Sequence, residues 1–467
     1  MINEISLRQF NAYCYIRDPR SSQFLREVAW FEAKGKTLLA VIVEEYIDSE
    51  YSYLILARDD RKVFQGVKLA ERFFRTKKRA ILECKIALEK YEFPEIEPKK
   101  KKGTKRAKPE EFLVPQVQKE KLHPYYQILL NNESYTPAKE LINEIVYSHL
   151  DVDGNYIKDF QTTGFDARLW ELFLHTFLLN SQFTIDTSFN VPDFLVSYFG
   201  KEFAIEAVTV NKSQNFDEPH PKNAAEIFLL SRDYMPIKYG SSLTSKLNKK
   251  YWEKDQVKGK PFILAIHDYH MPATKENFGS MIWSRTALSD YLYGLRMKSK
   301  IDKNGNICFE THTTQYSVEP INENIISHQW KDKSIPSNFF SLPDSEHVSA
   351  VLFANNATLA TFNRMGRLAG LGLENVKMIR TSTLYNPDPF ASEAILNEID
   401  IDDPSYEEAW GDGVMMYHNP KAKFPVDPGC FPEISHTFLD ISKGQLHGST
   451  LPYMPFGSVT EIFLPKS

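Results

Sequence analysis

Hydrophobic and polar positions alternate in short runs along the first 95 residues. Three runs rich in β-branched and aromatic residues are separated by the turn-like tripeptides DSE and DDR, at 37–45, 51–57 and 62–67. Such alternation between turn signals is typical of antiparallel strands, so we expect a β-meander. The segment from about Ala70 to Tyr91 has apolar residues on one helical face, which predicts a long helix. Residues 1–95 should therefore form a small N-terminal α+β domain.

The next segment is strongly basic. Seven of the ten residues from Lys99 to Lys108 are lysine or arginine, and prolines at 94, 98 and 109 bracket the run. Like charges repel one another and apolar residues are lacking, so we expect residues 96–115 to form a disordered, solvated linker. The functional alternative is a tether that contacts phosphate groups or a localisation signal. A domain boundary is predicted here in either case.

The rest of the chain, 116–467, alternates between helical and strand-like patterns. The expected helices are 166–180, 242–254, 284–295 and 357–370, and the expected strands are 191–199, 202–210, 261–267 and 348–354. This alternation predicts an α/β architecture. The stretch 387–435 is rich in proline and acidic residues, so we expect long ordered loops that wrap the core.

Composition adds few restrictions to this picture. The net charge of −5 gives no overall cationic field for nucleic acid, which leaves a local basic surface open. The four cysteines lie far apart without a CxxC pair, so neither a cysteine zinc site nor a disulfide scaffold is expected. The chain begins without a secretory signal pattern, and its longest apolar runs, such as LLAVIV at 38–43, are too short to cross a bilayer. A reducing cytoplasm is the expected location.

The helix predicted over 166–180 is apolar on nearly every side and should be buried. Its interior polar residues Arg168, Glu171 and His175 are spaced by three and four, so they lie on one stripe. A buried carboxylate is costly unless it has a partner or a metal. Taken alone, this stripe favours an ion pair of Glu171 with Arg168 or His175.

The segment NVPDFLVSYFGKEFAIEAVTVN reads as two strands joined by a two-residue turn at Gly200-Lys201. With that turn, Leu195 stands opposite Glu206. Side chains alternate between faces, so Asp193 and Glu206 point to the same side of an otherwise apolar sheet. Paired carboxylates attract a divalent cation, and hard oxygen ligands suit Mg²⁺.

This arrangement resembles the PD-(D/E)xK signature of the restriction-endonuclease-like nucleases, with Pro192-Asp193, a hairpin and then Glu206-Ala207. The resemblance implies a mixed sheet flanked by helices. It also implies Mg²⁺ or Mn²⁺ held by Asp193, Glu206 and the main-chain carbonyl of Ala207, with Glu171 near the metal. The activity implied is metal-dependent cleavage of phosphodiester bonds, with DNA favoured over RNA. Such nucleases are frequent in bacterial restriction and anti-phage systems.

The sequence departs from the family at the lysine position, which is Val208. Valine cannot orient water or stabilise charge on a phosphate group. Some members of the family are thought to carry the lysine on the following helix, here about Ser242 to Glu253, which offers Lys246 and Lys250 one turn apart. A solvated lysine face is the alternative, and a second copy of the chain or a partner subunit is another source of the cation.

Three interpretations follow. The first is a nuclease, with Lys246 or Lys250 stabilising the developing charge and the N-terminal domain engaging substrate or partner. The second is an inactive scaffold that binds nucleic acid or protein, in which Asp193 and Glu206 would be paired with Arg168 or a lysine. The third is an enzyme of another class within 280–467, although no group of candidate catalytic residues in that region supports it.

Two further signals are set aside. The glycines of RMGRLAGLGLEN (Gly366, Gly370 and Gly372) lack the lysine-serine pair of a P-loop and are expected to end a helix. His418-Asn419 suggests an HNH-type nuclease, but His436 does not have the required spacing.

Overall fold

The structure is a computed structural model. It describes residues 1–14, 17–59, 62–92, 112–148, 155–211, 219, 221–269, 283–313, 318–384, 386, 388, 391, 394–451 and 455–464. Most of the predicted basic linker lies outside the described residues. The last four positions of that prediction belong to the second domain, because Phe112 is fully buried and its ring packs 4.8 Å from the ring of Phe160.

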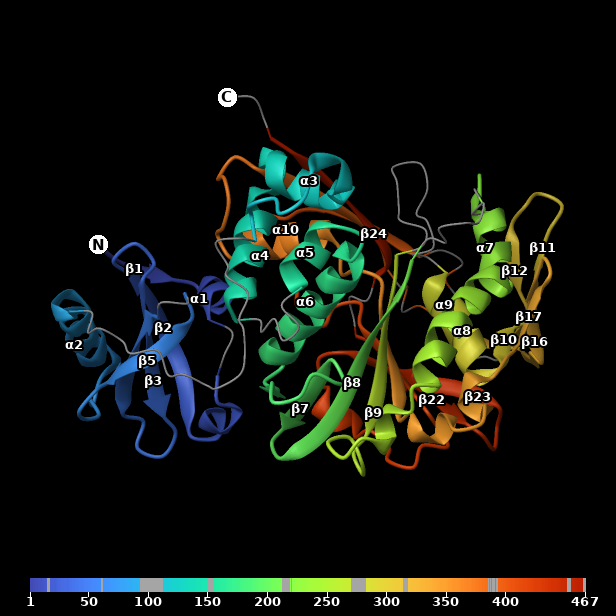
Figure 1. Cartoon of the computed structure of the whole chain (residues 1–467), viewed down its shortest axis with the longest axis horizontal. Coiled ribbons are helices and arrows are strands. Elements are labelled where there is room, and N and C mark those ends of the chain that lie inside the picture. The colour runs from blue at the N-terminus through green and yellow to red at the C-terminus, as the bar shows by residue number, and fades with distance from the viewer. Residues whose placement is uncertain are drawn as a thin grey trace.

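The N-terminal unit is a five-stranded antiparallel sheet with a helix on one face (Figure 1). Its strands are in sequence order: β1 Ile2–Ile5, β2 Leu25–Ala33, β3 Leu38–Glu45, β4 Tyr51–Arg58 and β5 Phe64–Leu69. The three predicted strands correspond to β3, β4 and β5, whereas β1, β2 and the short helix α1 (Leu7–Tyr13) were not predicted. The helix α2 begins at Lys77, later than expected, because the Thr76 side chain accepts a hydrogen bond from the Arg79 N–H and caps it.

Both faces of this sheet are covered. On one face α2 (Lys77–Lys90) packs its buried residues against the strands, and this cluster contains Phe31, Ile55 and Leu88. Residues of the opposite face, including Leu39 and Val41, belong to the same hydrophobic cluster as the helices of the second domain. The two domains therefore share one continuous core.

The second domain is built on an eight-stranded mixed sheet, with strand order β23-β22-β21-β18-β9-β8-β7-β6. The bounds are β6 Thr184–Asp186, β7 Phe194–Tyr198, β8 Lys201–Val210, β9 Phe262–Asp268, β18 Ala350–Ala354, β21 Met415–His418, β22 Ser435–Asp440 and β23 Gln445–Ser449. The central strands β8, β9 and β18 are parallel to one another. All seven residues of β9 are buried, as expected for a strand covered on both faces. The predicted α/β architecture is confirmed at this level.

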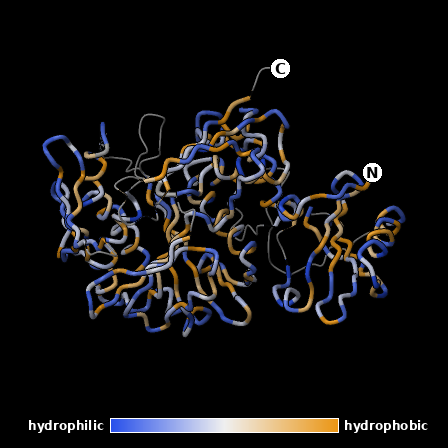
Figure 2. Tube along the Cα trace, turned by 180° about the vertical axis from the view of Figure 1, so that it is seen from behind, coloured by the Kyte–Doolittle hydropathy of each residue, from blue (hydrophilic) through white to orange (hydrophobic). Residues whose placement is uncertain are grey.

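Helices cover both faces of this sheet (Figure 1). One face carries α6 and α10, and the other carries α8 and α9. The helices of the domain are α3 Pro124–Asn131, α4 Thr136–Ser148, α5 Tyr156–Gln161, α6 Phe165–Asn180, α7 Ala224–Arg232, α8 Tyr234–Leu247, α9 Ser284–Tyr293 and α10 Leu359–Leu368. Hydrophobic segments follow the strands, whereas hydrophilic segments gather at the rim (Figure 2).

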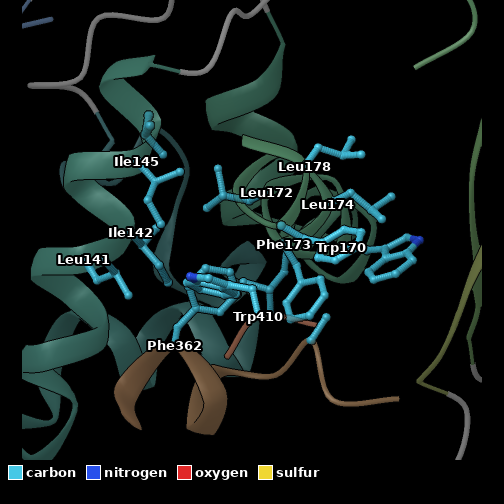
Figure 3. Close-up of a cluster of buried hydrophobic side chains, with 14 of the residues drawn as sticks. Leu141, Ile142, Ile145, Trp170, Leu172, Phe173, Leu174, Leu178, Phe362 and Trp410 are labelled. Carbon is cyan, nitrogen blue, oxygen red and sulfur yellow. The ribbon is translucent and has the colours of Figure 1, made fainter. Parts of the chain in front are cut away.

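Aromatic side chains join the helical layer. Trp410 packs between Phe173 of α6 and Phe362 of α10, with ring centroids 5.5 Å and 5.3 Å away (Figure 3). Helix α10 also lies very close to α4, since a Cβ at Gly366 would come within 2.3 Å of the Pro137 carbonyl oxygen. Gly370, with φ +70°, follows the end of α10 and confirms the expected helix end, whereas Gly366 lies inside the helix.

The C-terminal region contains more strands than predicted. The stretch expected to be loops contains β20 (Ile395–Asp400) and β21, and β20 forms a three-stranded antiparallel sheet with β19 (Lys377–Leu384) and β24 (Pro455–Phe463). Four small hairpin-like pairs lie between α9 and β18. Their strands are β10 Leu295–Met297, β11 Ser299–Ile301, β12 Ile307–Phe309, β13 Thr311–Thr313, β14 Val318–Pro320, β15 Asn322–Asn324, β16 Ser327–Trp330 and β17 Lys333–Pro336. Strands this short carry too little periodicity to be recognised.

Candidate functional site

The hairpin that carries the predicted carboxylates turns one residue earlier than expected. Phe199 and Gly200 form its two-residue turn, with φ of +46° and +87°. Positive φ at both turn residues is the geometry that suits the twist of a hairpin. Leu195 consequently pairs with Ala204, and the predicted pairing of Leu195 with Glu206 is wrong.

The error moves the register by two residues, so every side chain stays on its expected face. Continuing the observed register brings Asp193 opposite Glu206. The Asp193 N–H donates to Glu206 Oε2 at 3.4 Å, and Asp193 Oδ2 accepts from the Ala207 N–H at 2.7 Å. The two carboxylates are therefore closer neighbours than the predicted register implied.

Glu171 reaches the same place from α6. The indole Nε1 of Trp170 donates to the Ala265 carbonyl oxygen at 2.9 Å, which fixes this part of the helix to β9. Arg168 donates to Glu171 at 2.8 Å and to Asp159 at 2.8 Å, so the expected ion pair between Arg168 and Glu171 is present. His175 is buried away from this pair and contacts Ser148 Oγ at 3.3 Å.

Helix α8 supplies a lysine from the opposite face of the sheet. Lys246 Nζ lies 2.6 Å from Glu206 Oε1, and the Glu206 side chain is buried. Val208, at the position of the family lysine, is buried in the apolar cluster between the sheet and α8.

Lys250 lies elsewhere. The helix ends at Leu247, earlier than predicted, and Lys250 has a left-handed backbone with φ +49°. Its ammonium group pairs with Asp344 at 3.0 Å. The structure thus brings together Glu171, Asp193, Glu206 and Lys246 and leaves Lys250 outside.

Glu171, Asp193 and Lys246 line a cleft with a volume of about 420 Å³, and the buried Glu206 lies behind its wall, where it pairs with Lys246. Ala207, Trp170 and Thr209 contribute to its walls, together with Ser241, Ser242 and Ser245, which the sequence analysis did not single out. A signal was present in the sequence: Ser242, Ser245 and Lys246 are spaced by three and four residues, which places them on one helical face.

The cleft holds more carboxylate than cation. Loss of hydration inside the cleft raises the pKa of Asp193 to about 7, and the negative charges of Glu206 and Glu171 add to the rise. Asp193 is nevertheless an exposed residue. Burial also raises the pKa of Glu171, although Arg168 opposes the change. Burial and the neighbouring Glu206 carboxylate raise the pKa of the Tyr251 hydroxyl.

The composition of this group fits a divalent cation. Asp193, Glu206, Glu171 and Asp159 carry four negative charges when ionised, against one positive charge each on Lys246 and Arg168. Asp193 has no ion-pair partner among the described residues, although its main-chain environment holds it in place. Hard oxygen ligands with excess negative charge are the donors that Mg²⁺ prefers.

A different group brings three potential ligand side chains within 4.8 Å of one another. It consists of Asp344, Glu346 and His347, and no other such group occurs in the described part of the chain. Lys250 and Lys423 already pair with Asp344 and Glu346. The negative charge of this group is therefore matched, unlike that of the cleft.

The histidines set aside in the sequence lie together on β21 and β22. His418 Nε2 and His436 Nδ1 are 2.9 Å apart, and burial lowers the pKa of both rings. Asn419 donates its side-chain amide to the carbonyls of Ser345 and Val348. These contacts give the three residues a role in the core.

Comparisons with protein-family models, with curated proteins and with solved structures find no match to this chain. None of the described helices combines the length and apolar character needed to cross a membrane. The family resemblance therefore depends on the residues of the cleft and on their arrangement.

Proposed function

We propose that this protein is a metal-dependent nuclease with a restriction-endonuclease-like fold. One observation carries the proposal: Lys246, which lines a cleft together with Asp193 and Glu171, places its Nζ 2.6 Å from the buried Glu206. The residue types of the PD-(D/E)xK site meet in one place, with the lysine arriving from α8. The valine at position 208 is then compatible with catalysis, because Lys246 of α8 supplies the positive charge that the family lysine would provide.

The residues of the cleft divide the work. Asp193, Glu206 and the Ala207 carbonyl would hold the metal, with Glu171 beside them. A bound Mg²⁺ or Mn²⁺ would lower the pKa of a water molecule and neutralise charge on a phosphodiester. Lys246 places a positive charge beside Glu206, where phosphate oxygens would gain negative charge during cleavage. Ser245, on the same face of α8, offers a hydroxyl donor to orient the phosphate group, whereas the Ser242 hydroxyl donates to the Thr209 carbonyl oxygen at 3.4 Å.

The scaffold interpretation is the second candidate, and the same lysine favours it. Glu206 is buried and already paired with Lys246, and Glu171 is tied to Arg168. A fold that has lost catalysis would hold its former ligands in such ion pairs. The two candidates differ in what Asp193 does, because only a catalytic site requires its carboxylate.

The wider setting is part of the proposal. We assign DNA as the preferred substrate over RNA, and a role in bacterial restriction or anti-phage defence, by analogy with other nucleases of this kind. The N-terminal domain would engage the substrate or a partner. The described cysteines are all free, which fits the reducing environment of a cytoplasm.

A cleavage assay tests the proposal. Full-length protein would be incubated with plasmid, linear single-stranded DNA and RNA, in EDTA, Mg²⁺ or Mn²⁺. We expect cleavage that needs metal and falls by about 100-fold or more in Asp193→Ala and Glu206→Ala. The control is Asp344→Ala, which alters the other acidic group and should cut at the wild-type rate.

Each outcome decides between the candidates. Metal-dependent cutting that is lost in both cleft variants but kept in the control supports the nuclease. A wild-type protein that is inert on every substrate overturns the nuclease and favours the scaffold. Equal cutting by wild type and the cleft variants would place the chemistry elsewhere in the molecule.

A further inference from the structure

A second cavity lies beside the cleft, where β9 and β18 end and where α6 and α10 begin. Its volume is about 270 Å³. The last residues of β9, the loop after β18 and the first turns of both helices line it. The carboxyl ends of neighbouring parallel strands are where ligands bind in open α/β sheets.

The walls of this cavity are aromatic. Tyr125, Tyr135, Phe165 and Tyr269 all line it. The rings of Tyr125 and Phe165 lie 6.1 Å apart, and the Tyr269 hydroxyl donates to the Ala357 carbonyl oxygen at 2.7 Å, which fixes that ring. Flat faces held in place in this way suit a planar ligand.

Two hydrogen-bond acceptors in the lining are available. Asp166, in the first turn of α6, has no hydrogen bond or ion pair to another described residue. Asn356 is buried, and its Oδ1 has no partner in the described structure, while its Nδ2 donates to the Asp412 carbonyl oxygen. Buried polar atoms are usually satisfied, so an unpaired one needs an explanation.

A donor is available as well. His267 is fully buried, and its Nε2 accepts from the Ala357 N–H at 2.9 Å. A neutral ring that accepts at Nε2 carries its proton on Nδ1. That Nδ1 has no partner among the described residues. The lining thus contains two acceptors and one donor without a partner among the described residues, of which Asn356 Oδ1 and His267 Nδ1 are enclosed in the wall.

The positively charged side chain that lines this cavity already has an ion-pair partner. Arg364 lines it, but its guanidinium makes a two-point contact with Glu408 at 2.8 Å and 2.7 Å. An anionic ligand would therefore meet no uncompensated positive side chain in the described lining. This disfavours a phosphate group inside the cavity.

The cavity and the cleft are neighbours. Asp166 lines the cavity and Glu171 lines the cleft, about 7.5 Å apart along the axis of α6 at its rise per residue. On the sheet, Thr209 of the cleft pairs with His267 of the cavity. A ligand could therefore place one part in the cavity and another part in the cleft, because only a short distance separates the two sites.

We propose that this cavity binds a single nucleobase that carries an exocyclic amino group, with Asp166 and Asn356 accepting hydrogen bonds from its edge. The proposal rests on the proposed nuclease function only for the source of the base. A base from a substrate strand would be unpaired or turned out of a duplex, with its phosphate lying toward the cleft. Pockets of this kind hold a base by stacking and by contacts with its edge.

Binding measured in EDTA tests this proposal without any cleavage. Full-length protein would be titrated with labelled oligodeoxyadenylate and oligodeoxythymidylate of about 12 nucleotides, a size within the range of single-strand binding sites, and with the matching duplex. Free adenosine would be titrated separately by calorimetry. The variants are Asp166→Ala, which removes an acceptor, and Ala360→Phe, which fills the cavity from α10. Glu374→Gln, an exposed acid near the end of α10, is the control.

We expect oligodeoxyadenylate to bind about tenfold more tightly than oligodeoxythymidylate, because thymine has no amino group to donate. Asp166→Ala should remove most of that difference, and Ala360→Phe should weaken both oligonucleotides. The control should match wild type. Melting temperatures of all variants would show whether a loss of binding reflects unfolding.

Other results have definite meanings. Equal binding of the two oligonucleotides, unchanged in both cavity variants, overturns the proposal, and so does the absence of any binding. Adenosine binding that equals oligonucleotide binding and depends on Asp166 supports the pocket and identifies a free nucleoside as its source. Asp166-dependent binding without cleavage supports the pocket and overturns the nuclease. Metal-dependent cleavage by a protein that binds both oligonucleotides equally supports the nuclease and overturns the base-binding pocket.

Discussion

Two groups of charged residues in this protein differ in their balance of charge. Around Glu408, the guanidinium groups of Arg364 and Arg380 lie at 2.7 Å and 3.3 Å, and the Tyr406 hydroxyl donates at 2.6 Å. Around Glu206, one lysine faces several carboxylates. The first group is closed to solvent, and the second opens into a cleft.

The pKa values show the consequence. Burial acts to raise the pKa of Glu408, but Arg364 and Arg380 outweigh it and hold the value at about 2. In the cleft, the pKa of Asp193 rises to about 7 because Lys246 offsets only part of the effect of lost hydration and of the nearby negative charges. A buried group whose positive and negative charges match stabilises the fold, whereas a group with excess negative charge is a candidate site for a cation.

The largest effect is expected at the balanced group. Glu408→Gln leaves two buried guanidinium groups without their carboxylate, so we expect the free energy of unfolding to fall by about 3–5 kcal/mol. Urea denaturation would measure it. Glu398→Gln, an exposed acid on β20, is the matched control and should change stability by less than about 0.5 kcal/mol. A loss at Glu408 no larger than the control would mean that the network contributes nothing.

A smaller effect, on activity, is expected at the unbalanced group. Lys246→Ala removes the positive charge beside Glu206 and should lower the cleavage rate by about 100-fold, or roughly 2.7 kcal/mol. Lys250→Ala, on the neighbouring exposed lysine, should cut within about twofold of wild type. Lys246→Arg keeps a positive charge beside Glu206, so a loss of cleavage in this variant without a loss of stability would show that the lysine itself is needed for catalysis. If Lys246→Ala cuts like wild type, the lysine serves only the structure.

The smallest effect concerns the pH dependence of stability. The pKa of Asp193 in the folded state, about 7, lies above its ordinary value, so the folded state loses stability as the pH rises from about 4 to about 7, and the full loss is present above that range. Asp193→Asn in EDTA should therefore melt about 1–2 °C higher than wild type near pH 8. Below about pH 4, where the carboxyl is protonated in both folded and unfolded chains, the difference should vanish. A lower melting temperature near pH 8 would show that Asp193 is a stabilising residue like Glu408.

Much of the cleft could be predicted from the sequence because its elements have strong patterns. The apolar runs of α6, β7, β8 and β9 gave their positions to within a few residues. The turn was placed one residue late, since either pair that includes Gly200 suits a two-residue loop. That error left Asp193 and Glu206 on the same face, because moving a two-residue loop by one position changes the pairing by two.

Other features depended on contacts that no local pattern shows. The end of α8 at Leu247 decided between Lys246 and Lys250, and the apolar stripe continued past it to Tyr251. The aromatic cavity draws on residues from Tyr125 to Thr460, which are distant in sequence. Strands β22 and β23 lie at the edge of the sheet, where alternation is weak and propensity gives little guidance.

The shared core of the two domains matters for anyone who wishes to divide the protein. A fragment that stops near residue 92 would display Leu39, Val41 and their neighbours to water, since α4 and its layer would be missing. It would also lose the partner of Arg58, which pairs with Glu144 at 2.6 Å. Such a fragment should self-associate through this apolar face. The N-terminal sheet is better studied as part of the whole chain than as a detachable module.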